Sequence, residues 1–566
     1  MGVAQHTDSF HRCVCSTRRV TTTLLRGGRI HTAYDPAATA IAITDGVISW
    51  IGAEHGIEQA GHIDRTVDLG GLFVAPAFID SHVHSADAGL ALTGLDLSAA
   101  QSLPQCLDHI RGYAKAHPAA VIWGHGWDES GWPEKRWPTL AEIDAVVGDR
   151  VAYFARVDVH SALVSSRVHR QLDPSAVGFS GDGPLTQISN LAARDLARAA
   201  MPVEQCGDAQ RAFLDHCARH GIVEVHECGF PDPRSLSELR GLLSMANVPV
   251  AVRGYLAAAV TDPQEARELL LQSGAHALAG DLSVDGAIGS TTASLCAPYL
   301  DAASRGNRYL GDDAITEHLV ACALAGIQPG FHAIGDDAVD AVAAGLRRAA
   351  ERLGPNGSVA LAAVTPRIEH AEMVGPEAIA TFAATGTVAS VQPLFDALWG
   401  GEAGMYSQRL GGERAGRMNP FAALASAGVT LALGSDAPVT PADPWAAVQA
   451  AVHHRTPGFG LSSRGAFTAH TRGAHRAAGR VERGVGTISV GAPADIAIWQ
   501  AGELVRPVSA EKLSRWSTDP KSRVPLLPDL MPGNDLPSCV ATISAGKVTF
   551  DGSGLLESGA AESQLL

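Results

Sequence analysis

The stretch LFVAPAFIDSHVH, residues 72–84, is an apolar segment that ends in a polar run containing two histidines. Its length and its apolar residues predict a buried β-strand over residues 72–80. Alternate side chains of an extended chain point to the same side, so His82 and His84 face the same way just beyond this strand. Two imidazoles held together in this way are typical of a metal-binding pair.

Seven further short apolar segments follow in the middle of the chain, and most of them end in Gly, Asp or His. They cover residues 222–227, 248–256, 282–286, 328–332, 367–370, 388–392 and 430–436. Helical stretches rich in Ala, Leu and Arg lie between them. Eight strands that alternate with helices are the pattern of an α/β protein with a TIM-like (β/α)8 barrel. We expect residues 72–84 and 200–483 to form this barrel.

The remaining parts of the chain predict further units. Residues 20–71 and 484–556 both contain short alternating segments separated by turn glycines, and Asp45-Gly46 is a hairpin signal. They predict one composite β-sandwich domain built from both ends of the chain. Residues 85–199 are too many for a loop, so they predict an insertion domain after the first barrel strand. Residues 1–19 are expected to be a disordered leader.

The composition excludes several classes of protein. The 566 residues are 46% hydrophobic and 18% charged, which suits a large buried core. The net charge is −16 and no basic run occurs, so we expect no nucleic-acid partner. Neither a run of 18 uncharged apolar residues nor a signal-peptide core is present, so we expect no membrane partner and a cytoplasmic location. The predicted partner is a small-molecule substrate, with a homodimer as one option for assembly.

Three more strand ends carry residues that bind metals. His332, His370 and Asp436 each lie at the end of a predicted strand. A barrel brings the carboxyl ends of its strands to one face, so these residues are expected to meet His82 and His84 there. Imidazole nitrogens and carboxylates are suitable ligands for zinc or a similar divalent ion. The alternative is a set of unrelated helix caps and buried hydrogen-bonding groups.

On these motifs the chain resembles the amidohydrolase superfamily of metal-dependent hydrolases, in the family 3 branch and most closely the N-substituted formamide deformylases. The resemblance covers nearly the whole chain. It rests on PAFIDSHVH (76–84), WGHGWDE (123–129), RVDVHSALVSS (156–166), DGAIGSTTA (285–293), FHAIGDDAVD (331–340), RIEHAE (367–372), SVQP (390–393), LGSDAPV (433–439) and GAPADIAIW (491–499). It implies a barrel with a composite β-sandwich, and it implies His82, His84, His332, His370 and Asp436 as site residues.

The chain departs from this superfamily at one metal ligand. Many members with two metals bridge them with a carbamylated lysine at the fourth barrel strand. The matching position here is Asp281, and no lysine lies between Lys135 and Lys512, so no carbamylated lysine is expected. Three options follow: Glu227 bridges two ions, Asp281 supplies the carboxylate, or the site holds a single ion. Of these, bridging by Glu227 is preferred, and the cofactor is expected to be one or two divalent ions, with Zn²⁺ as the first candidate.

Three residues are candidates for contact with the substrate. The resemblance suggests that the segment around His160 faces the pocket. Asp285 either orders a ligand or substrate group or forms a turn. Trp127 either lines the pocket or belongs to the core of the insertion.

The predicted function is that of an enzyme, a metal-dependent hydrolase that cleaves a non-peptide C–N bond in an amide, N-formyl or ureide-like small molecule. A divalent ion lowers the pKa of bound water, and Asp436 would act as general base and then as general acid. A deaminase or an esterase using the same site is one alternative. A catalytically weak relative that keeps the fold for binding is another, because fold alone does not fix chemistry.

Overall fold

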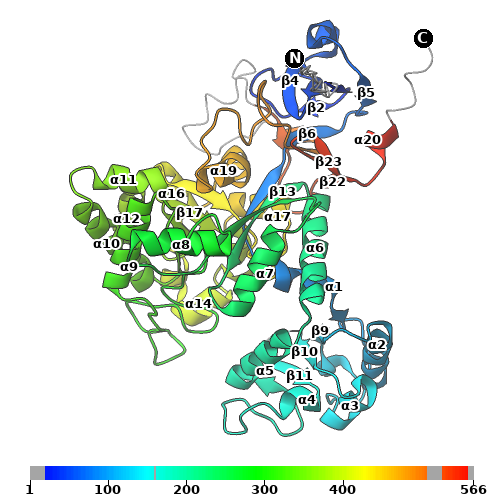
Figure 1. Ribbon diagram of the computed structural model, residues 1–566, viewed down its shortest axis with the longest axis vertical. Helices are drawn as coiled ribbons and strands as arrows, with labels where there is room; N and C mark the ends of the chain where they lie inside the picture. Colours follow the sequence, from blue (N-terminus) through cyan, green and yellow to red (C-terminus); the bar gives the residue numbers. More distant parts are fainter. Residues whose placement is uncertain (1–19, 158–160, 506–524, 559–566) are drawn as a thin grey trace, which may run out of the picture.

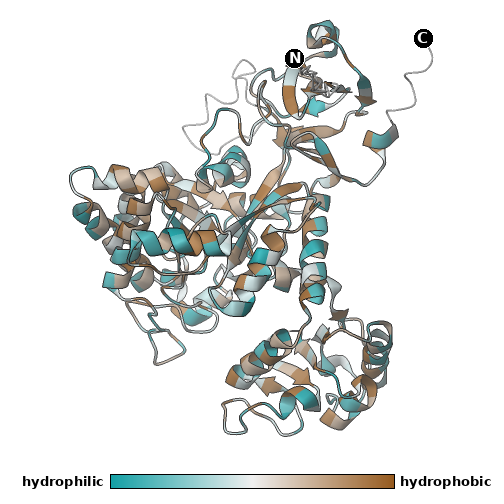
Figure 2. Ribbon diagram, viewed as in Figure 1, coloured by the Kyte–Doolittle hydropathy of each residue, from teal (hydrophilic) through white to brown (hydrophobic). Residues whose placement is uncertain are grey.

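The computed structural model describes residues 20–157, 161–505 and 525–558, and it has a mixed α/β fold. Figure 1 shows a large central part, a β-rich part at one end that contains segments from both ends of the chain, and the insertion at the opposite end. The most hydrophobic segments in Figure 2 are the strands and the inward faces of the helices around them. None of the helices in the described ranges combines the length and the apolar composition needed to cross a bilayer.

The central part contains two sheets in which every pairing is parallel. The first has the order β14 (Ala251–Leu256), β13 (Ile222–Gly229) and β7 (Phe78–Val83). The second has the order β15 (Gly330–Ala333), β16 (Arg367–His370), β17 (Val388–Val391) and β18 (Thr430–Leu433). All residues of β7, β13, β16 and β17 are buried, as expected for parallel strands with helices outside them.

Isolated parallel bridges connect these two sheets on both sides. Val83 at the end of β7 pairs with Ala437, just after β18. On the other side, Tyr255 pairs with Ala277, and Leu278 pairs with Pro329 before β15. The segment between β14 and β15 therefore occupies the place of the expected strand 282–286, but it makes single bridges instead of a regular strand. Gly280, with a φ of +76°, interrupts the extended chain there.

The apolar run expected to be one strand over 72–80 is divided between two sheets. Residues of β6 (Phe73–Pro76) pair with β19 (Ile496–Gln500) near the end of the chain, and β7 begins after Ala77 in the central part. A continuous apolar run gives no information about which sheet each half joins, so sequence alone did not place this division.

The two ends of the chain supply two further sheets. One has the order β4 (Val47–Gly52), β3 (Ala40–Thr44), β1 (Thr22–Arg26) and β5 (Arg65–Asp68). The other has the order β2 (Arg29–Ile30), β6, β19, β22 (Ser538–Ser544) and β23 (Lys547–Asp551). Asp45 and Gly46 both have positive φ in the turn between β3 and β4, as that pair favours. Residues of both sheets, such as Ile41 and Ile496, share one buried cluster.

The insertion has its own sheet, in the order β12 (Leu185–Thr186), β11 (Ser161–Val164), β10 (Ala152–Arg156), β9 (Ile122–Trp127) and β8 (Leu95–Asp96). The helices α2 (Leu103–Ala116), α3 (Leu140–Val147) and α5 (Gln187–Ala199) pack around it (Figure 1). Two helices lead into and out of it, α1 (Ser85–Thr93) and α6 (Val203–Arg219). They touch closely at Gly89, where a Cβ would lie 1.8 Å from the carbonyl oxygen of Ala209.

Candidate metal centre

The two histidines at the end of β7 point into one buried polar cluster. His82 is fully buried, and its Nδ1 lies 2.9 Å from Oε2 of Glu369. This contact directs Nε2 of His82 to the opposite side, toward the carboxylates of Asp281 and Asp436 at 3.4 and 3.5 Å. His84 lies beside it, and its Nε2 is 3.0 Å from Oδ2 of Asp281 and 3.3 Å from Oδ1 of Asp436.

A third histidine approaches the same cluster from the end of β16. Nε2 of His370 lies 3.8 Å from Oδ1 of Asp281, and its Nδ1 is 2.9 Å from Oε1 of Gln392. Gln392 therefore orients His370 as Glu369 orients His82, which is the usual arrangement around imidazole ligands of metals.

These side chains meet the geometric conditions for holding a cation. One ligand atom from each of His82, Asp281 and His370 lies within 4.8 Å of the others, and the same holds for His82, His84 and Asp436. Nε2 of His82 and Oδ1 of Asp281 are buried and accept or donate no hydrogen bond within the described residues. Buried polar atoms are rarely left without a partner. Two such atoms that face each other fit a site in which a divalent ion lies between them.

The electrostatics of the cluster favour added positive charge. Burial disfavours the protonated form of His82, but the neighbouring Cys228, Asp281 and Asp436 outweigh burial and raise its pKa well above the usual value. Burial would raise the pKa of Asp281, but the surrounding histidines lower it well below the usual value. A bound cation would supply the positive charge that two adjacent carboxylates require.

The backbone is held in an unusual conformation at two of these residues. His370 and Asp436 have φ values of +69° and +56°, in the left-handed region that costs a non-glycine residue on the order of 1–3 kcal/mol. Neighbouring contacts maintain this conformation: the amide of Asp436 donates to the carbonyl of His82 at 2.8 Å. The carboxylate of Asp80 accepts hydrogen bonds from the amides of His82 and Ser435, which ties β7 to the loop after β18.

A buried arginine supports Glu369, and the sequence analysis did not identify either residue. Nε of Arg367 donates to Oε1 of Glu369 at 2.5 Å, and the guanidinium also donates to Ser390 and lies 4.5 Å from the ring centroid of Tyr255. Burial would raise the pKa of Glu369, but Arg367 and His82 lower it to about 2. The alternation in RIEH, which puts Arg367 and Glu369 on one face of β16, was the available signal.

Two of the expected metal ligands are not part of either cluster. Glu227 is buried at the end of β13, but its Oε2 accepts a hydrogen bond from the amide of Ser85 at 2.9 Å and it joins neither group of converging atoms. Asp281, the other carboxylate considered, belongs to one of these groups. The ring of His332 lies 4.5 Å from that of His370, although its nitrogens also lie outside both groups.

Two of the three expected substrate contacts, Asp285 and Trp127, are buried. Asp285 is 1% exposed and accepts hydrogen bonds from the amides of Ser294, Ile334 and Gly335. Its Oδ1 also lies 3.5 Å from Nδ1 of His332, so it connects loops and contacts one of the expected metal ligands. Trp127 is fully buried in the core of the insertion, where its indole donates to the carbonyl of Phe154. His160 lies outside the described residues.

Comparisons with known proteins identify the family of this chain. The profile of the Amidohydrolase family matches residues 65–550. Protein LONG AFTER FAR-RED 3 of Arabidopsis thaliana is 26% identical over 87% of this chain and 90% of its own length. Putative amidohydrolase YtcJ of Bacillus subtilis is 26% identical over 75% of this chain and 82% of its own length. The crystal structure of an uncharacterized metal-dependent hydrolase from Pyrococcus furiosus superposes with a TM-score of 0.70 and 25% identity, covering 84% of this chain and 98% of that chain. The matched relatives indicate that this protein is a hydrolase, and the chain belongs to the amidohydrolase family.

Proposed function

We propose that this protein is a metal-dependent hydrolase that cleaves a non-peptide C–N bond in a small amide, N-formyl or ureide-like substrate. The observation that carries the proposal is the convergence of His82, His84, Asp281, His370 and Asp436 at the carboxyl ends of the central strands. The two parallel sheets and the bridges that connect them support a closed barrel, in which this is the face where active sites are found.

The side chains at the metal centre have separate proposed roles. Asp281 would help to hold a divalent ion, because its Oδ1 faces His82 and His370 while its Oδ2 faces His84. Nδ1 of His332 lies 3.5 Å from Oδ1 of Asp285, and its ring is 4.5 Å from that of His370, so His332 is placed beside the site with its ring oriented by Asp285. When bound, a divalent ion of the zinc type would polarise the scissile carbonyl and lower the pKa of an attacking water.

Asp436 is the proposed general base and general acid. Its Oδ1 lies within 3.5 Å of both His82 and His84, so it borders the place where the attacking water would lie. It would accept the proton of that water and then transfer it to the leaving nitrogen, which departs as the neutral amine. The left-handed backbone of Asp436 holds the carboxylate in this position.

Aromatic rings beside the cluster indicate an apolar group on the substrate. The ring of Phe230 is stacked on that of His84, with 6.3 Å between the ring centroids. Phe230 is 40% exposed, so it presents an open apolar face next to the reacting centre. Phe395 stacks in the same way on His370 at 6.0 Å. An N-formyl or N-acyl derivative of an aromatic or aliphatic amine fits these surroundings, and such a substrate would agree with the deformylase resemblance.

Metal analysis and an activity screen together test the proposal. Purified protein should contain one or two equivalents of a divalent metal, Asp281→Asn should lower this content, and Glu227→Gln should leave it unchanged. Asp436→Asn should keep the metal and lose turnover by at least a hundredfold, the lower end of the usual contribution of general catalysis. The screen should use N-formyl, N-acyl and ureide compounds with separate detection of formate, amine and ammonia.

The products distinguish the competing functions. Formate or amine release supports amide hydrolysis, ammonia release from a ring amine would indicate a deaminase, and turnover of esters alone would indicate an esterase. Protein that holds no metal and turns over none of these compounds after metal is supplied would refute the proposal.

A further inference from the structure

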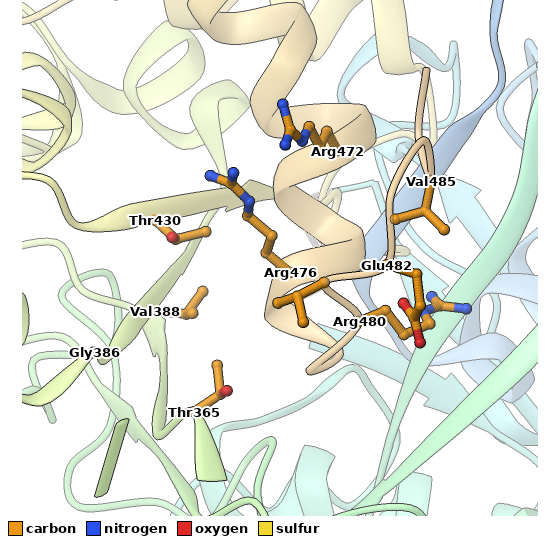
Figure 3. Close-up of a pocket in the computed structure, with 10 residues that line it drawn as sticks. Thr365, Gly386, Val388, Thr430, Arg472, Arg476, Arg480, Glu482 and Val485 are labelled. Carbon is orange, nitrogen blue, oxygen red and sulfur yellow. The ribbon is translucent and has the colours of Figure 1, made fainter. Parts of the chain in front are cut away.

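A second polar pocket lies at the opposite end of the strands that carry the proposed metal centre. It is a cavity of about 330 Å³ lined by Thr365, Val388 and Thr430 at the starts of β16, β17 and β18, and by Arg472, Arg476 and Arg480 (Figure 3). His370 and Asp436 lie at or beyond the other ends of β16 and β18. Strands of four residues are roughly 13 Å long, so the pocket is separate from the metal centre.

Arg472 and Arg476 lie on one face of one helical run, and Arg480 follows that run just after Gly479. They are spaced four residues apart, and the run passes from α18 (Ser463–Thr468) through a π-helical segment (Ala469–Gly473) into α19 (Ala474–Ala477). Residues four apart on a helix lie side by side. Gly473 brings this run against β18, because a Cβ there would lie 2.2 Å from the carbonyl oxygen of Leu431.

Two of these guanidinium groups are available to a ligand. Arg480 forms an ion pair with the buried Glu224. Arg472 and Arg476 are exposed, and neither side chain has a hydrogen-bond or ion-pair partner in the described part of the chain. Figure 3 shows both on the same side of the helix, with Arg476 extending toward Thr430. A pair of unpaired arginines is notable in a chain with 59 acidic and 43 basic residues.

The remaining lining residues indicate what accompanies the anion. Thr365 and Thr430 offer hydroxyl groups, and the backbone of Thr365 is held at a φ of +53°, a strained conformation for a β-branched residue. Val481 and Val485 supply an apolar wall, and Glu482 supplies an acceptor for hydroxyl groups. The cavity is far larger than an inorganic phosphate and is within the range of small-molecule sites, about 300–1,000 Å³.

We propose that this pocket binds a small phosphate monoester that carries hydroxyl groups, such as a sugar phosphate. Arg472 and Arg476 would hold the phosphate, because the planar guanidinium group donates two parallel hydrogen bonds to phosphate oxygens. Two positive charges match the charge of a phosphate monoester near neutral pH. Glu482 and the threonines would bind the hydroxyl groups of the sugar. This site is independent of the reaction at the metal centre.

The test measures ligand binding to the full-length protein by isothermal titration calorimetry in phosphate-free, low-salt buffer. The probes are glucose 6-phosphate, ribose 5-phosphate, AMP, inorganic phosphate, citrate and glucose. At least one sugar phosphate should bind with a Kd below 1 mM and more tightly than inorganic phosphate, citrate or glucose. Arg476→Gln and Arg472→Gln should each weaken that binding at least tenfold. Arg417→Gln removes an equivalent charge from an exposed arginine outside the pocket and should have no effect.

Several results would overturn the proposal. These are the absence of binding by every phosphate ester, equally tight binding of citrate, and binding that survives both arginine substitutions. Binding that is lost in Asp281→Asn but retained in Arg476→Gln would place the phosphate at the metal centre, and it would also overturn the proposal. Arg472 and Arg476 are exposed, so both variants should keep the melting temperature of the wild type, which shows that any lost affinity is local.

Discussion

Replacing Glu369 by glutamine should weaken metal binding although Glu369 does not face the metal centre itself. One oxygen of Glu369 accepts from Arg367 and the other lies 2.9 Å from Nδ1 of His82. Glutamine offers one oxygen in place of two, so it can serve only one of these partners, and its amide group then meets a donor. His82 would lose the contact that fixes its ring and directs Nε2 toward Asp281.

The expected magnitude follows from these contacts. Losing an oriented partner of a ligand imidazole typically costs 10- to 100-fold in metal affinity, or about 1.4–2.7 kcal/mol. The substitution also leaves the charge of Arg367 buried without its carboxylate, which costs about 3–5 kcal/mol of folding stability. Arg367 keeps its hydrogen bonds to Ser81 and Ser390 and its contact with Tyr255, so we expect the lower end of that range.

Glu224→Gln is the matched control. Glu224 is also buried, also pairs with an arginine and also contacts a histidine, but it lies at the start of β13, away from the metal-facing atoms. Both variants should lose stability in urea unfolding. Only Glu369→Gln should lose affinity for Zn²⁺ in competition with a chromophoric chelator. Equal affinities for the wild type and Glu369→Gln, or an equal loss in both variants, would refute the role given to Glu369.

The remaining predictions concern pH, substrate, the insertion and the metal. Burial would raise the pKa of Glu224, but His226 and Arg480 lower it to about 2, so its stabilisation is complete above pH 4.5 and is lost as the pH falls toward 2. The difference in unfolding free energy between wild type and Glu224→Gln, about 3 kcal/mol at pH 7 by linkage, should therefore shrink below pH 4.5, and a constant difference would contradict this. Phe230→Ala should lower kcat/KM about 2- to 10-fold for an aromatic substrate but not for a small polar one, and equal losses would exclude stacking. Trp127→Ala should cost about 3–5 kcal/mol of stability in the insertion with no change in metal content. Loss of metal without loss of stability would instead indicate that Trp127 is part of the metal site. Treatment with a chelator should lower the melting temperature and added Zn²⁺ should restore it; an unchanged melting temperature would mean that the fold holds no metal.

The residues that the sequence predicted best are those whose positions follow from strand ends. His82, His84, His370 and Asp436 each follow a short apolar segment, and the structure brings all four together. This inference needs only two facts: parallel strands end on one side, and alternate side chains share a face. Neither fact requires knowledge of side-chain conformations.

The sequence could not resolve choices that depend on distance across the fold. Glu227 and Asp281 were both predicted to lie near strand ends. Only the tertiary structure shows that the carboxylate of Glu227 accepts a hydrogen bond from the amide of Ser85. Trp127 was compatible with a pocket wall or a local core, because an indole serves both. Asp285 was compatible with a ligand or a turn, and its three backbone partners come from segments far from the Asp-Gly pair itself.

The local backbone supports the proposal that Asp281 serves at the position where the superfamily resemblance implies a longer carbamylated lysine. Asp281 follows Gly280, whose left-handed φ and missing side chain let the backbone approach Cys228 and Tyr255; a Cβ there would lie 3.1 Å from the Cys228 sulfur. The short carboxylate of Asp281 lies 3.0–3.8 Å from three imidazoles. An aspartate side chain is thus long enough to reach these histidines from this position. For this reason the missing lysine does not argue for a site without metal.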